Sequence, residues 1–283
     1  MQTETIPVRI STYSEIATRT MQLREVLAER NIRFHRDSAL GKLLRDAETL
    51  AKEWDEGQTQ EFRRLVNAAH ANRIAEAILA VRDDANAQEC LSRIAGNDVN
   101  LSGRARSQGK DHLWELDLLY ALRRRGIPAK LADPPDIVID LSDSSFPIAC
   151  KKVYSENGIE AQLRKGVKQL AEHGHGGLVA LNIDDLVPDD TILQSRDQRE
   201  ASDFLHRINQ AFVERHRITL QRFVKDRRCD GILVSTAVLA DLENSKPRFN
   251  LVTETMLWTL DSVSPETAGR FAELRERLAS KSI

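Results

Sequence analysis

Cysteine is scarce in this chain of 283 residues, which contains only Cys90, Cys150 and Cys229. The three are far apart in the sequence and form no C-x-x-C pair. An odd number of isolated cysteines fits neither a disulfide framework nor a zinc cluster. We therefore expect all three thiols to be reduced.

Aromatic residues are also few, at 5%, and the chain has 13 glycines and 8 prolines. This composition argues against a β-sandwich and favours a helix-rich chain with a compact strand-bearing part. The sequence lacks an apolar run of the roughly 18 residues that a membrane-spanning helix needs, and its first residues lack the order of a signal peptide. We expect a cytoplasmic protein with no membrane partner.

An excess of one charge is missing as well, since the formal net charge is -2. Residues 1–100 carry 14 Lys and Arg against 16 Asp and Glu, and residues 101–283 carry 27 against 27. A uniform basic field is thus excluded in both parts. Any contact with nucleic acid must come from a local patch of basic side chains.

Residues 14–95 have apolar side chains at three- and four-residue steps, which predicts four helices separated by short polar connections. The periodicity stops in residues 96–110, where Gly, Ser, Asn and basic residues concentrate. We therefore place a boundary there. The prediction is an all-α helical domain over residues 1–100 and a second domain over residues 101–283.

The second part changes to short apolar runs between turn residues. A helix is predicted in DHLWELDLLYALRRRG and is closed by Gly126. The expected order after it is three strands, helix, strand, helix and strand. The strands are predicted in AKLA, DIVIDL, FPIACKKV, GLVALNI and GILVSTAVL. This order predicts a mixed-sheet α/β core with helices on its faces.

Three charged residues in this part lie at positions where a charge is costly to bury or where the backbone holds it rigidly. Glu115 interrupts an apolar helix and therefore needs a cation or a metal as a partner. Asp136 follows two prolines and opens a strand. In the next strand, alternation puts Ala149 and Lys151 on the face opposite Cys150. If the two strands pair in an antiparallel way, Asp136 and Lys151 converge.

These residues resemble the motif of the PD-(D/E)XK nuclease superfamily, which has the restriction-endonuclease-like fold, and the resemblance covers about residues 110–240. It implies that Glu115 is the acidic residue of the first core helix and that Asp136, in Pro135-Asp136, is the Asp of the PD element. It further implies that Lys151 is the lysine of the (D/E)XK element and that Gln169 is the glutamine of the following helix.

One position departs from the pattern, because Ala149 stands where the second acidic ligand belongs. Three interpretations stay open. Ala149 is an engineered inactivating change, or the carboxylate has migrated to Asp140 or Glu115, or the domain binds without cutting. The departure matters because carboxylates are what hold a hard divalent ion.

The resemblance implies a metal-dependent endonuclease that hydrolyses phosphodiester bonds, with DNA favoured over RNA. Asp136 and Glu115 would hold Mg²⁺ or Mn²⁺, Lys151 would orient the attacking water, and Gln169 would position substrate or water. The alternative is a catalytically silent nuclease-fold protein that binds nucleic acid or a protein partner. In a third hypothesis the N-terminal helices dominate function and the nuclease-like domain is a scaffold.

Local basic patches supply the expected contacts to nucleic acid. The candidate residues are Lys152, Lys165, Lys168, Arg222 and Lys225. The N-terminal helices carry no catalytic motif, and helical hairpins of this kind commonly form a packing platform, a dimer interface or a docking surface. We therefore expect them to serve in homodimer formation or in binding a protein partner.

Overall fold

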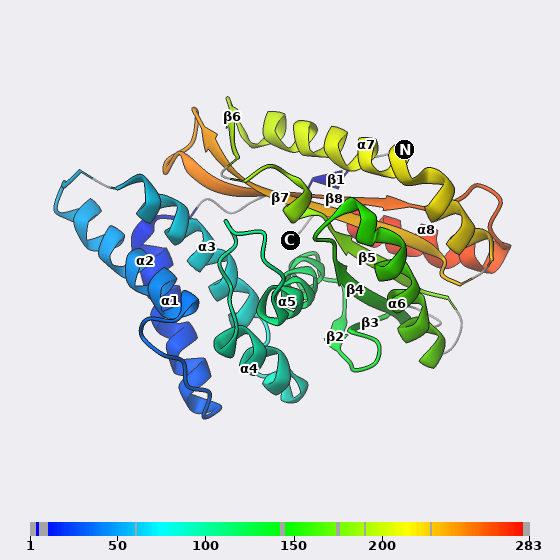
Figure 1. The fold of residues 1–283 in the computed structure, drawn as a ribbon, viewed down its shortest axis with the longest axis horizontal. Helices are drawn as coiled ribbons and strands as arrows, with labels where there is room; N and C mark the ends of the chain where they lie inside the picture. Colours follow the sequence, from blue (N-terminus) through cyan, green and yellow to red (C-terminus); the bar gives the residue numbers. More distant parts are fainter. Residues whose placement is uncertain are drawn as a thin grey trace.

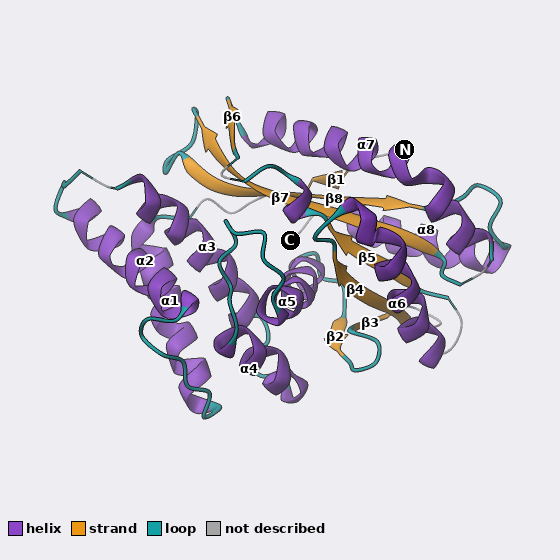
Figure 2. Ribbon diagram, in the orientation of Figure 1, coloured by secondary structure: helices purple, strands orange, loops and turns teal. Residues whose placement is uncertain are grey.

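A computed structural model of the chain describes residues 4–5, 11–59, 61–141, 145–173, 176–189, 191–226 and 228–279. Over these residues helices pack around a single curled sheet, which contains both parallel and antiparallel strand pairs (Figures 1 and 2). The predicted mixed α/β class is confirmed.

The four N-terminal helices are α1 (Tyr13–Glu29), α2 (Ala39–Asp55), α3 (Phe62–Leu79) and α4 (Gln88–Gly96), as the apolar spacing predicts. The start of α1 is fixed by a capping box, in which the Thr12 side chain accepts from the Glu15 N–H and Glu15 accepts from the Thr12 N–H. Ser38 caps α2. Helices α1, α2 and α3 pack against one another through their buried apolar faces.

The second part begins with α5 (Gln108–Arg124), which ends before Gly126, a residue with φ of +69°. An antiparallel meander follows, made of β2 (Ala129–Leu131), β3 (Ile137–Asp140) and β4 (Ser145–Lys152). Most of the predicted turn between β3 and β4, residues 142–144, lies outside the described residues. The three strands agree with the prediction, and β3 and β4 pair in the antiparallel direction that convergence of Asp136 and Lys151 requires.

The remaining elements complete the sheet and cover it. They are α6 (Ile159–Glu172), β5 (Leu178–Asn182), β6 (Ile192–Ser195), α7 (Gln198–Lys225), β7 (Gly231–Leu242), β8 (Phe249–Trp258) and α8 (Pro265–Ala279). Strands β4, β5 and β7 run parallel, and β8 pairs with β7 in the antiparallel direction. Within the described residues the strand order is β1-β8-β7-β5-β4-β3-β2, with β1 at Glu4–Thr5 and β6 beside β7.

Helices cover the two faces of β4 differently. Phe146, Ile148 and Cys150 join a large core that includes α5 and helices α1–α4, whereas Ala149 joins a separate core with α6 and α7. Helix α5 therefore lies between the N-terminal helices and the sheet (Figure 1). The core continues across residue 100, so the division into residues 1–100 and 101–283 stays a prediction.

Candidate functional site

Asp136 and Lys151 meet at the edge of the sheet where β3 begins and β4 ends. The pairing of Ile137 with Ile148 places the residue before β3 beside the last residues of β4. Lys151 Nζ lies 3.0 Å from Asp136 Oδ2, and the Cys150 N–H donates to the same oxygen at 2.6 Å. Strand pairing and alternation therefore bring together the two residues that the sequence predicts.

Gln169 reaches the same carboxylate from α6. Its Nε2 donates to Asp136 Oδ1 at 3.1 Å, so both oxygens of Asp136 accept hydrogen bonds. The other end of this amide, Gln169 Oε1, is buried and has no hydrogen-bond partner among the described residues. An oxygen acceptor next to a carboxylate is thus left unsatisfied.

Glu115 approaches from α5, and its direct partners are His112 and Cys90. Its Oε2 lies 3.0 Å from His112 Nδ1 and 3.4 Å from Cys90 Sγ. Burial raises the pKa of Glu115, the bond with His112 opposes this, and the negative charge of Asp136 raises the pKa further. Glu115 is therefore in electrostatic contact with Asp136 without a hydrogen bond to it.

Ala149 is fully buried and contributes no ligand atom. It packs in the apolar core between β4 and α6, together with Val153, Leu163, Val167 and Val179. The predicted alternation is confirmed, because Ala149 and Cys150 belong to cores on opposite faces of the sheet. A carboxylate at position 149 would have to displace apolar contacts or point toward Lys151.

Asp140 is not a replacement for the missing carboxylate. It stands opposite Ser145, at the far end of β3 from Asp136, and forms an exposed ion pair with Lys130 at 3.3 Å. The hypothesis that the second ligand migrated to Asp140 is therefore wrong. The reason is strand length, because three residues of the extended strand β3 lie between Asp136 and Asp140.

The prediction that Lys152 contacts nucleic acid does not agree with its environment. Its side chain is buried, with Nζ 2.6 Å from Asp185 Oδ2 and 2.7 Å from Asn182 Oδ1. The ammonium is therefore held by two acceptors and does not lie on the outer surface of the protein. Alternation explains the difference, because Lys152 points to the opposite face of β4 from Lys151.

The other candidate contacts lie on the outer surfaces of α6 and α7. Lys165, Lys168 and Lys225 are exposed, and Arg222 pairs with Glu160 at 3.1 Å. This ion pair joins the two helices. The role of the four cations in binding nucleic acid stays a prediction.

His112 and Cys90 are absent from the candidates that the sequence suggests. The spacing His112-x-x-Glu115 was available as a signal, because residues three apart lie on one face of a helix. Cys90 could not be linked to them, since it lies on α4 and the packing of α4 against α5 brings it near. Cys90, His112 and Glu115 form a compact cluster of three potential ligand atoms.

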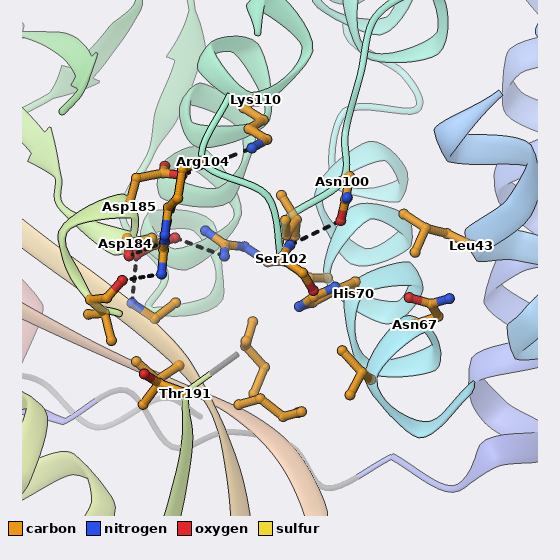
Figure 3. Close-up of a pocket in the computed structure, with 18 of the residues that line it drawn as sticks. Leu43, Asn67, His70, Asn100, Ser102, Arg104, Lys110, Asp184, Asp185 and Thr191 are labelled. Carbon is orange, nitrogen blue, oxygen red and sulfur yellow. Dashed lines mark hydrogen bonds and ion pairs between the residues drawn. The ribbon is translucent and has the colours of Figure 1, made fainter. Parts of the chain in front are cut away.

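A cavity of about 850 Å³ opens at the carboxyl ends of β4 and β5. It is bounded by α2, α3, the segment 98–104, the start of β6, the interior of β7 and the beginning of β8. Figure 3 shows Arg104 and Lys110 close to Asp184 and Asp185 on one side, with Asn67 and His70 on the other. Ligands in open α/β folds commonly bind at such an edge, and the volume suits a small molecule.

Among the charged side chains that line this cavity, basic residues outnumber acidic ones. The described basic residues are Lys42, Arg63, Arg73, Arg104, Lys110 and Lys152, against the acidic residues Asp98, Asp184 and Asp185. Burial lowers the pKa of His70 to about 4, so this side chain is neutral near pH 7, and its Nδ1 has no described partner. The cavity thus offers cations at its rim and a buried imidazole in its wall.

No family model, curated protein or solved structure matches the chain. Among the described residues, none of the helices combines the length and the apolar character needed to cross a membrane. Cytoplasmic localisation stays a prediction.

Proposed function

We propose that residues 101–283 form a restriction-endonuclease-like core of the PD-(D/E)XK type and that the protein is a metal-dependent endonuclease that hydrolyses phosphodiester bonds in DNA. The observation that carries the proposal is the contact of Asp136 with both Lys151 and Gln169. These side chains come from the start of β3, from β4 and from α6, in the order that the resemblance implies. The helix α5 that precedes the meander carries Glu115.

The donor atoms at the site fit a hard divalent ion such as Mg²⁺ or Mn²⁺. Asp136 and Glu115 supply carboxylate oxygens, and Gln169 Oε1 is a buried oxygen that lacks a partner. Oxygen ligands of this kind are what these ions prefer. A cation would also relieve the repulsion between the two carboxylates. We therefore assign Asp136 and Glu115 as the protein ligands.

The chemistry that such an ion supplies is polarisation of the scissile phosphate and a lower pKa for the attacking water. The remaining roles belong to side chains of this protein. Lys151 holds its ammonium at Asp136, where it can donate to the water or to a phosphate oxygen. Gln169 fixes the orientation of the Asp136 carboxylate through Nε2.

The test is cleavage of linear, circular and single-stranded DNA in the presence of Mn²⁺ or Mg²⁺. The unchanged chain is expected to cut, and Lys151→Ala should reduce cleavage by on the order of 100-fold or more, because it removes the group that orients the water. Lys130→Ala is the matched control, since Lys130 pairs with Asp140 at the other end of β3. Equal cleavage by the unchanged chain and Lys151→Ala would contradict the proposal.

A second function, binding without cleavage, is supported by the complete burial of Ala149 among apolar side chains. The cavity favours an anionic ligand, because the exposed side chains of Lys42 and Arg63 at its rim have no ion-pair partner among the described residues. In this case nucleic acid or a nucleotide would bind without metal.

Ala149→Glu separates the two functions. Cleavage gained by this variant and lost again with Lys151→Ala would identify a nuclease centre that lacks one ligand. DNA binding without metal by every variant, together with no cleavage by any of them, would favour the silent binder. Loss of that binding in Lys42→Ala with Arg63→Ala would assign it to the cavity.

A further inference from the structure

Cys90, His112 and Glu115 place one sulfur, one nitrogen and one oxygen at the corners of a small triangle. Cys90 Sγ lies 3.6 Å from His112 Nδ1 and 3.4 Å from Glu115 Oε2, and the third side, from His112 Nδ1 to Glu115 Oε2, is 3.0 Å. Each atom is one that metal ions commonly bind in proteins.

The dimensions of the triangle agree with those of a tetrahedral zinc site. Zinc lies about 2.3 Å from sulfur and about 2.0–2.1 Å from nitrogen or oxygen, so tetrahedral angles place pairs of ligand atoms roughly 3.3–3.6 Å apart. The three measured distances, 3.0 to 3.6 Å, need changes of only a few tenths of an ångström. The three ligand atoms, which contact one another by hydrogen bonds, therefore already lie at about the spacing that a bound zinc ion requires.

Packing of two helices holds this arrangement. His112 and Glu115 are three residues apart on one face of α5, and Cys90 comes from α4, which packs directly against α5. Cys90 is buried, whereas His112 and Glu115 are partly exposed. An ion can therefore reach the triangle from the side of His112.

We propose that Cys90, His112 and Glu115 bind Zn²⁺, with the fourth position taken by water. A sulfur ligand selects zinc over the hard ions Mg²⁺ and Mn²⁺, which prefer oxygen. On binding, the thiol proton of Cys90 leaves to solvent and the proton of His112 resides on Nε2, so that Sγ and Nδ1 are free to coordinate. The site joins α4 to α5, goes beyond the proposed nuclease function and shares only Glu115 with it.

The experiment is titration of the full chain, freed of metal, with Co²⁺ and Zn²⁺. The expected result is one tightly bound ion per chain that gives a thiolate-to-cobalt charge-transfer band. Cys90→Ser should abolish that band and weaken Zn²⁺ binding by on the order of 100-fold or more. Cys150→Ser is the matched control, because Cys150 is also buried in the same core and lies outside the triangle. This variant should keep both the band and the affinity.

Two results would overturn the proposal: cobalt binding without a sulfur band, or Zn²⁺ affinity in Cys90→Ser equal to that of the unchanged chain. If Cys90→Ser fails to fold, His112→Ala is the alternative variant, because it leaves the packing of Cys90 in place. Unchanged Zn²⁺ affinity in His112→Ala would also overturn the proposal. Lys151→Ala keeps the zinc and cobalt signals if this inference is right, even where it abolishes DNA cleavage. Failure of the zinc site and failure of the nuclease function are therefore distinguishable.

Discussion

Lys151 Nζ lies 3.0 Å from Asp136 Oδ2, and the exposed fractions of the two side chains are 13% and 9%. The pair is therefore largely removed from water, where an unpartnered charge is costly. The Lys130–Asp140 pair joins the same meander, but its side chains are 61% and 53% exposed. Two lysine–aspartate pairs on neighbouring strands thus differ mainly in burial.

This difference predicts a large coupling energy for the buried pair. A double-mutant cycle with Lys151→Met and Asp136→Asn should give a coupling on the order of 1–3 kcal/mol in the free energy of unfolding, because either single change leaves the other group buried alone. The same cycle with Lys130 and Asp140 should give less than about 1 kcal/mol. Urea unfolding measures both coupling energies. Equal values for the two pairs would contradict the conclusion that burial strengthens the Lys151–Asp136 pair.

Ala149→Glu should destabilise the protein. The new carboxylate would enter a core of apolar side chains, and we expect a loss of about 3 kcal/mol or more in the free energy of unfolding. Ala161→Glu, at an exposed position of α6, is the control and should change stability by about 0.5 kcal/mol or less. Denaturant midpoints with and without Mn²⁺ check this, and a cost no larger than that of the control would show that position 149 accepts an acid.

Arg73 should be among the side chains most important for stability. Its guanidinium on α3 lies 2.6 Å from Asp117 on α5 and 3.0 Å from Asp184, in the 3-10 helix Asp184–Leu186, and all three are largely buried. Arg73→Met leaves two buried carboxylates without their cation and should cost about 3–5 kcal/mol.

The control for this prediction is Arg82→Met, because Arg82 forms an exposed pair with Glu29 and should contribute less than about 1 kcal/mol. Burial raises the pKa of Asp117 to about 6 even though Arg73 opposes the shift. Adding Asp117→Asn to Arg73→Met should therefore recover part of the lost stability. A double variant less stable than Arg73→Met alone would contradict this account.

Glu254 should make stability depend on pH. Its side chain is fully buried and accepts from Ser202 Oγ at 2.6 Å, and burial raises its pKa from 4.5 to about 7. Between these two values the folded state keeps a proton that the unfolded state has lost. The stabilisation that protonated Glu254 contributes to the folded state is therefore complete below pH 4.5 and is lost as the pH rises to about 7.

Comparison of the unchanged chain with Glu254→Gln isolates this effect, because glutamine does not titrate. The unchanged chain should lose on the order of 2 to 3 kcal/mol relative to the variant as the pH rises through that window. Urea unfolding at a series of pH values measures the difference. A difference that stays constant with pH would show that Glu254 is not the titrating group.

Local patterns were sufficient for much of this fold. Apolar spacing predicts helices α1 to α4. The runs around Asp136 and Lys151 predict two successive strands, on which these residues meet if the strands pair in the antiparallel direction, as they do. Both follow from side-chain periodicity, which is a property of neighbouring residues. Strand β8 was missed although its residues alternate between buried and partly exposed, because polar residues such as Glu254 occupy some buried positions.

The errors concern partners that lie far away in the sequence. Lys152 looks like a solvated lysine at a strand end until Asp185, 33 residues later, is brought beside it by β5. In the same way, Cys90 meets His112 only through the packing of α4 on α5. The spacing of apolar residues does not predict such contacts, because they depend on how whole helices and strands pack.

One hydrophobic core is continuous between the N-terminal helices and the sheet, so the two parts of the chain share it. Leu113, Trp114 and Leu116 of α5 are buried in the core that also contains residues of the N-terminal helices. A fragment that starts near residue 101 would expose part of this apolar surface to water, and such patches promote aggregation. The contribution of the N-terminal helices is therefore better measured by substitutions on their outer surface than by deletion.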